Sequence, residues 1–139
     1  MIRYKKLHPD AKVPVRATTG SACYDIFAVE DDRIDYSTGP VKIRTGLAFE
    51  IPPGKCMVIY SRSSVFLNGD VLMTPTVIDS DYRGEVFILM RPMCDSFPIK
   101  KGDRIAQFKI ENAPTELFEE VEELLPTERG AGGLGSTGR

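Results

Sequence analysis

The stretch VKIRTGLAFEI, residues 41–51, decides the fold class because its apolar side chains recur at every second position. An alternation of period two is typical of a strand that buries one face. The pair Thr45-Gly46 interrupts the pattern, so the sequence predicts a half-buried strand with a break at that point. The apolar positions of this stretch are Val41, Ile43, Leu47, Phe49 and Ile51.

Three more stretches favour strands. RIAQFKIE, residues 104–111, again alternates between apolar and polar side chains. VFILM (86–90) and CMVIY (56–60) are continuous apolar runs, which we interpret as fully buried strands. Ten prolines and twelve glycines punctuate the chain at short intervals. Many short strands, and hence an all-β domain, are therefore expected.

Two segments carry helix signals. After SRSS, residues 61–64, Ser63 or Ser64 can cap a short helix that Gly69 ends. The segment ELFEEVEELL, residues 116–125, places its apolar side chains at positions i, i+1, i+4, i+7 and i+8. This spacing alone predicts a second helix.

The C-terminal stretch RGAGGLGSTGR, residues 129–139, contains five glycines and one large apolar side chain, so it cannot form a packed element. Two interpretations stay open from these residues alone. The stretch is either a disordered terminus or a flexible loop that closes over an anion, with successive amides pointing at a phosphate.

The composition limits the possible partners. The chain has 139 residues, of which 42% are hydrophobic and 27% charged, as expected for one soluble domain. A net charge of −2 does not indicate nucleic-acid binding. No apolar run approaches the ~20 residues that cross a bilayer, and no signal-peptide pattern is visible. No membrane association and a cytoplasmic location are therefore expected.

The rarity of histidine limits the possible chemistry. His8 is the only histidine, which argues against serine–histidine or cysteine–histidine catalysis and against a histidine-ligated zinc site. Cys23, Cys56 and Cys94 have no C-x-x-C spacing and are expected to be reduced, packed thiols. Hydrolysis by this chain would depend on carboxylates, cations and backbone amides.

The stretch TVIDSDYRGE, residues 76–85, gathers Asp79, Asp81 and Glu85 around Tyr82. Carboxylates this close repel one another unless water, a cation or a cationic ligand separates them. Both an ordinary polar turn and a site for a charged ligand fit these residues.

Five short stretches, each weak alone, occur in one order: ATTGSACYDI, SRSS, VIDSDYRGE, GDRIAQF and RGAGGLGSTG. In this order and spacing they resemble the five motifs of the trimeric deoxyuridine triphosphatases, the dUTPases, over essentially the whole chain. The resemblance implies a jelly-roll-like β-barrel that forms a homotrimer by exchanging C-terminal strands. Residues 1–125 would form the barrel and its exchanged strand, and residues 126–139 a flexible glycine-rich lid. Residues 116–125 would then be extended, against their helical spacing.

The resemblance also implies an activity, the hydrolysis of dUTP to dUMP and pyrophosphate at sites shared between subunits. Asp79 matches the catalytic carboxylate, which activates the water that attacks the α-phosphorus. Tyr82 matches the tyrosine that packs against the deoxyribose and leaves no room for a 2′-hydroxyl. The implied cofactor is Mg²⁺, bound through the phosphates, with Asp25 acting indirectly through the metal's water.

Other substrate contacts are implied in three groups. The phosphates would be bound by Arg62, Ser63, Ser64 and Gln107. The uracil and its surroundings would be contacted by Met73, Thr76, Val77, Ile78 and Phe87. The lid would contribute Arg129, Leu134, Gly135, Ser136 and Thr137.

The chain departs from the family pattern at several positions. Met73 and Thr76 stand where family members typically have asparagine and glycine, a difference that bears on base selectivity. Leu134 replaces the aromatic residue that stacks on uracil, and Ser61 replaces a proline. Two alternatives therefore stay open. One is a pyrophosphatase or deaminase acting on another pyrimidine deoxynucleoside triphosphate, with cytosine or a modified base. The other is a non-catalytic nucleotide-sensing regulatory module.

Overall fold

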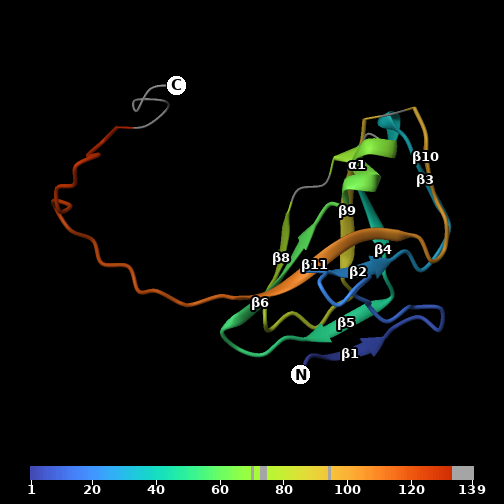
Figure 1. Ribbon diagram of the computed structural model, residues 1–139, viewed down its shortest axis with the longest axis horizontal. Coiled ribbons are helices and arrows are strands. Elements are labelled where there is room, and N and C mark those ends of the chain that lie inside the picture. Colours follow the sequence, from blue (N-terminus) through green and yellow to red (C-terminus); the bar gives the residue numbers. More distant parts are fainter. Residues whose placement is uncertain (70, 73–74, 94, 133–139) are drawn as a thin grey trace.

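The fold is built almost entirely from strands, in a computed structural model that describes residues 1–69, 71–72, 75–93 and 95–132 (Figure 1). The all-β fold class is confirmed, and the short helix expected after SRSS is present as α1 (Ser63–Gly69). A 3-10 turn, η1, covers Tyr36–Thr38. The strands are β1 (Arg3–Lys6), β2 (Tyr24–Phe27), β3 (Asp32–Ile34), β4 (Val41–Arg44), β5 (Leu47–Glu50), β6 (Lys55–Tyr60), β7 (Val71–Leu72), β8 (Thr76–Ile78), β9 (Phe87–Pro92), β10 (Phe97–Ile99) and β11 (Arg104–Asn112).

Antiparallel sheets enclose a single apolar core. The largest sheet has the order β2-β11-β6-β8, and its long strand β11 pairs with both β2 and β6. Smaller sheets are formed by β4-β9-β7, β1-β5 and β10-β3. This arrangement is consistent with a jelly-roll-like barrel. The largest fully buried side chains belong to Ile26, Val29, Ile34, Ile43, Leu47, Ile51, Met57, Ile59, Ile88, Met90 and Ile99.

The predicted break in the strand at residues 41–51 is confirmed. β4 ends at Arg44, β5 begins at Leu47, and Gly46 between them has a φ of 67°. A β-carbon at Gly46 would lie 2.9 Å from the β-carbon of His8 and 3.0 Å from that of Ala11. Backbone conformation and crowding therefore both require glycine at this position.

The burial of two other strands corrects the sequence-based prediction. VFILM and CMVIY were expected to be buried on both faces, but β9 and β6 alternate. Leu89 of β9 is 41% exposed, and Val58 of β6 is only partly buried. Each strand lies in an antiparallel sheet with one face toward the core, and its other face also carries apolar residues. A continuous apolar run cannot distinguish these two situations.

The chain leaves the barrel after β11, as the orange and red trace in Figure 1 shows. Within residues 113–132 it forms no helix or strand, so the helix predicted from the spacing of residues 116–125 is wrong, and the segment is extended. A ten-residue helix is marginal in water, and the five glutamates of this segment would repel one another at helical spacings. The helix α1 is too short to cross a bilayer, and no other helix among the described residues could do so.

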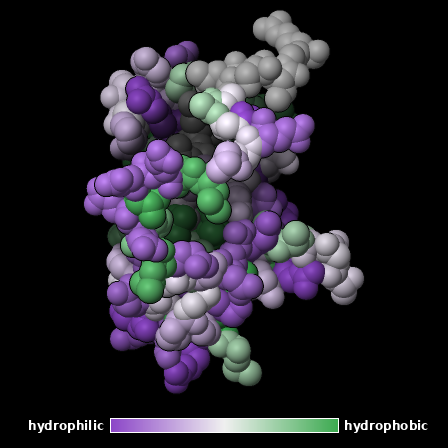
Figure 2. Space-filling model, turned by 90° about the vertical axis from the view of Figure 1, so that its left-hand side faces the viewer, coloured by the Kyte–Doolittle hydropathy of each residue, from purple (hydrophilic) through white to green (hydrophobic). Residues whose placement is uncertain are grey.

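The extended segment exposes apolar side chains. Leu117 and Phe118 are 96% and 100% exposed, and Leu124 and Leu125 are almost as open. Apolar surface is also visible among polar side chains on the side of the molecule from which this segment emerges (Figure 2). Exposed apolar surface of this kind is common where one macromolecule binds another.

Candidate active site

A pocket of about 290 Å³ brings together residues from three of the five motifs. Asp25 lies on β2, and Gln107 is its register partner on the neighbouring strand β11. Ser63 and Ser64 open helix α1, which follows β6, so the sheet and the helix together form the walls. The described residues that line the pocket are Ala17, Ser21, Ala22, Cys23, Asp25, Arg62, Ser63, Ser64 and Gln107.

The electrostatics of this first pocket are set by two guanidinium groups around one carboxylate. The side chain of Asp25 is 9% exposed, with Arg62 Nε 3.0 Å from Oδ1 and Arg104 Nη1 3.3 Å from Oδ2. Arg62 also donates to the backbone carbonyl of Arg104 at 2.9 Å. Two positive charges against one negative charge leave a net positive charge beside the pocket, which favours an anionic ligand. Arg104 belongs to the motif GDRIAQF, but the resemblance implied no substrate contact for it.

Gln107 is held in place by the backbone at the edge of the pocket. Its side-chain nitrogen donates to the carbonyl of Ser61 at 2.9 Å. An amide nitrogen carries two hydrogens, so one donor is left for a ligand. The backbone carbonyl of residue 61 thus orients Gln107, and any residue type at position 61 could supply this carbonyl.

A second pocket of about 230 Å³ lies between β8, β9 and the turn that connects them. It contains Asp79 and Tyr82 together with the other residues of this region that the resemblance assigns to the substrate. Glu85 and Leu89 also line this pocket, although the sequence did not predict them as site residues. The described residues that line it are Thr76, Val77, Ile78, Asp79, Tyr82, Glu85, Phe87 and Leu89.

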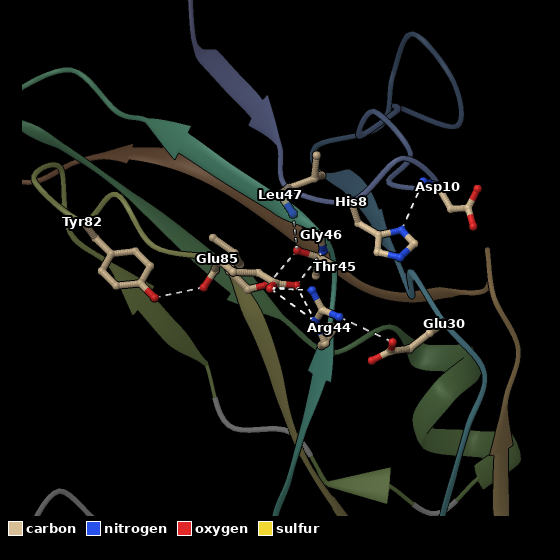
Figure 3. A network of polar contacts seen from close by, with 10 residues as sticks. His8, Asp10, Glu30, Arg44, Thr45, Gly46, Leu47, Tyr82 and Glu85 are labelled. Atoms are coloured by element: carbon tan, nitrogen blue, oxygen red, sulfur yellow. Dashed lines mark hydrogen bonds and ion pairs between the residues drawn. The ribbon is translucent and has the colours of Figure 1, made fainter.

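The turn in this second pocket holds the Tyr82 ring over its own backbone. The amide of Tyr82 donates to the carbonyl of Asp79 at 3.2 Å, and its hydroxyl donates to the carbonyl of Glu85 at 2.9 Å (Figure 3). A β-carbon at Gly84 would lie 2.6 Å from Cζ of the ring, so only glycine allows the ring to fold back this closely. Asp79 is exposed at the rim of this pocket.

The carboxylate of Glu85 does not pair with Arg83, the cation nearest to it in the sequence. Arg83 donates to the carbonyls of Ser80 and Tyr82 at 2.6 and 3.0 Å. Glu85 instead pairs with Arg44 of β4, 41 residues away in sequence. A pair of residues this far apart in the sequence cannot be inferred from local spacing.

The two pockets have no lining residue in common among the described residues. One chain therefore carries the cationic pocket and the Asp79–Tyr82 pocket as separate surfaces. Arg129 lies in neither; its Nε donates to the carbonyl of Gly132 within the exposed tail at 2.9 Å. Five predicted site residues lie outside the described residues: Met73, Leu134, Gly135, Ser136 and Thr137.

Solved structures of known proteins share this fold. The chain superposes on the dUTPase of Staphylococcus bacteriophage 80alpha, a G164S mutant with dUpNHpp, with a TM-score of 0.91 and 27% identity. The match covers 100% of this chain and 99% of the phage protein. The fold is thus that of a dUTPase.

Sequence comparisons agree with the fold. The dUTPase family model matches residues 9–138. The chain is 45% identical to the deoxyuridine 5′-triphosphate nucleotidohydrolase of Nautilia profundicola, with 99% of each protein covered. It is 39% identical to that of Helicobacter pylori strain P12, with 99% of this chain and 96% of the relative covered. The chain belongs to the dUTPase family, a family of enzymes, and the resemblance seen in its five motifs is confirmed.

Proposed function

We propose that this protein hydrolyses dUTP to dUMP and pyrophosphate. The observation that carries the proposal is the first pocket, on a member of this family. Arg62, Ser63, Ser64 and Gln107 line it together with Asp25, whose carboxylate pairs with Arg62 and Arg104. Cations, hydroxyls and an amide are the donors that a triphosphate needs. The dUTPase of Staphylococcus bacteriophage 80alpha binds the dUTP analogue dUpNHpp, which supports a deoxyuridine triphosphate as the substrate.

In the phosphate half of the site, Asp25 would act indirectly, through the water bound to the metal ion. Because both of its oxygens face guanidinium groups, Asp25 is held in one orientation. A carboxylate has about four lone-pair sites, so it can still accept hydrogen bonds from the water around a metal ion. Among the described residues, no cluster of three or more carboxylate, histidine or cysteine side chains could hold a metal. These residues fit Mg²⁺ bound through the phosphates, where the ion would offset the charge of the triphosphate.

The chemical step would be carried out by Asp79. Its carboxylate takes a proton from a water molecule as the water oxygen attacks the α-phosphorus. The bond from that phosphorus to the bridging oxygen breaks, and pyrophosphate leaves with the electron pair. An exposed carboxylate suits this part, because water reaches it freely.

The nucleoside half of the site would be built around Tyr82. The fixed ring gives the deoxyribose a flat surface, and a 2′-hydroxyl would collide with it. Thr76, Val77 and Ile78 of β8 would contact the base with main-chain and side-chain groups. Phe87 would contribute an apolar wall of the same pocket. Met73 is assigned to the base on the motif match alone.

A complete site would need more than one chain. The two pockets lie on separate surfaces of the chain, and the apolar tail side chains lack cover within it. A homotrimer that exchanges residues 116–125 would cover these side chains and bring the two pockets of neighbouring chains together. Residues 126–139 would then close over the nucleotide as a lid, with Arg129, Leu134, Gly135, Ser136 and Thr137 facing it. A cytoplasmic location stays a prediction from the sequence.

Hydrolysis of dUTP in ¹⁸O-labelled water with Mg²⁺ tests the reaction type. Attack on the α-phosphorus is expected to give dUMP that carries one heavy oxygen, and unlabelled pyrophosphate. Mass spectrometry of both products measures the label. A label found in pyrophosphate, or formation of dUDP and phosphate, would contradict the proposed step.

A further inference from the structure

The carboxylate of Glu85 lies between the Tyr82 turn and Arg44 of β4 (Figure 3). Its side chain is 12% exposed. Arg44 Nη2 donates to Oε2 at 3.1 Å, and Arg44 Nε donates to Oε1 and Oε2 at 3.2 and 3.3 Å. Such multiple charge-assisted bonds fix the orientation of both groups.

A third donor to Glu85 comes from a crowded turn between β4 and β5. The amide of Gly46 donates to Oε1 of Glu85 at 2.8 Å. Gly46 is packed between His8, Ala11 and Val29 so closely that a β-carbon would not fit. The adjoining Thr45 hydroxyl donates to the carbonyl of Val86 at 2.6 Å. The end of the turn is therefore tied to a segment that has little freedom to move.

The same residue holds the tyrosine through its backbone. The Tyr82 hydroxyl donates to the Glu85 carbonyl at 2.9 Å, while Gly84 allows the ring to approach. A continuous series of bonds thus runs from the Arg44 guanidinium, through the Glu85 side chain and carbonyl, to the edge of the Tyr82 ring. Displacing the Glu85 carboxylate would displace the carbonyl that orients the ring.

Charges around Arg44 show that Glu85 is its main partner. Glu30 is the other carboxylate near the guanidinium, with Oε2 3.5 Å from Nη1, and it does not touch the turn. Hydrogen bonds to Glu85, followed by the negative charge of Glu85, raise the pKa of Arg44 above its ordinary value. The Arg44 guanidinium therefore stays protonated opposite Glu85, as arginine does in folded proteins.

We propose that Arg44 and Glu85 are positioning residues that set the place of the Tyr82 ring and thereby the preference for deoxyribose over ribose. The inference rests on the proposed function, since it takes Tyr82 as the residue against which the sugar packs. A ring that is free to shift would admit a 2′-hydroxyl, so a loosened turn should lose discrimination between dUTP and UTP. A pair that only stabilised the barrel would affect both nucleotides equally.

The test compares kcat/KM for dUTP and for UTP in the full chain with Mg²⁺. Arg44→Met and Glu85→Gln are each expected to lower the dUTP-to-UTP ratio by about tenfold, the effect of losing a charge-assisted hydrogen bond. Arg44→Lys, which keeps the charge but not the fork of donors, should retain part of the ratio. Glu30→Gln is the matched control, because it removes the other carboxylate at the same guanidinium, and it should leave the ratio within about twofold.

A double-mutant cycle shows whether Arg44 acts through the ring. Tyr82→Phe removes the hydroxyl that bonds to Glu85, so Arg44→Met should change the ratio far less in a Tyr82→Phe background than in the wild type. Additive effects, or an unchanged ratio in both Arg44→Met and Glu85→Gln, would overturn the inference. If the wild-type chain prefers dUTP and the variants give these results, only the positioning role of Arg44 and Glu85 is contradicted. A wild-type chain that releases no pyrophosphate from dUTP contradicts the proposed function as well.

Discussion

Replacing Asp79 by asparagine is expected to lower the turnover of dUTP by about 10²–10⁴-fold while nucleotide binding is retained. The amide has the shape of the carboxylate but cannot take a proton from water. Asp79 is exposed at the end of β8, so the change removes no buried contact and should not disturb folding. Steady-state release of pyrophosphate measures turnover, and isothermal titration with dUpNHpp measures binding.

Asp81 provides the matched control for this substitution. It is an exposed carboxylate in the same turn and does not line the Asp79–Tyr82 pocket. Asp81→Asn changes the charge of the turn by the same amount and is expected to keep turnover within about threefold, as for most surface substitutions. Turnover that survives in Asp79→Asn, or that falls equally in both variants, would show that Asp79 is not the base.

The second large effect is expected from charges placed in the extended tail. In Leu117→Asp/Phe118→Asp the new carboxylates cost nothing in the isolated chain, because both positions are almost fully exposed. Burial of these two side chains against a neighbouring chain would contribute about 3–6 kcal/mol to assembly. The double variant should therefore dissociate the proposed trimer into folded monomers and lose turnover, since the proposed site is shared between chains.

Light scattering with size-exclusion chromatography measures the mass, and circular dichroism checks that the barrel remains folded. Glu119→Gln in the same segment is the control and should keep both the mass and the turnover of the wild type. A double variant that stays trimeric and active would contradict the exchange of residues 116–125. A wild type that is an active monomer would contradict the shared site itself.

Local sequence patterns predicted the strands well where one face met the core. Alternation in residues 41–51 and 104–111 predicted β4, β5 and β11, and the serines of SRSS predicted the short helix α1. The same method failed for VFILM, because Phe87 and Leu89 are apolar yet line the Asp79–Tyr82 pocket rather than the core. It also failed for residues 116–125, where apolar side chains recur at a helical spacing but belong to an extended segment.

Only the site residues that lie within or close to the five motifs could be predicted from the sequence. Asp25, Ser64 and Gln107 were expected on one site, and the structure brings them into one pocket. That Asp79 and Tyr82 lie in a different pocket of the chain is a property of the fold, which no local stretch contains. The partners Arg44 and Glu85 are 41 residues apart and meet only because β4 lies beside β9.

The most direct test of dUTP hydrolysis is a set of initial rates on dUTP, dTTP, dCTP and UTP with Mg²⁺ and the full chain. We predict the highest kcat/KM for dUTP, with stoichiometric pyrophosphate and no ammonia from dCTP. In the proposed site Thr76, Val77 and Ile78 would contact the base, Tyr82 would exclude the ribose of UTP, and Asp79 would activate water. Equal or faster hydrolysis of dTTP or dCTP, or ammonia released from dCTP, would contradict the assignment of dUTP as the substrate.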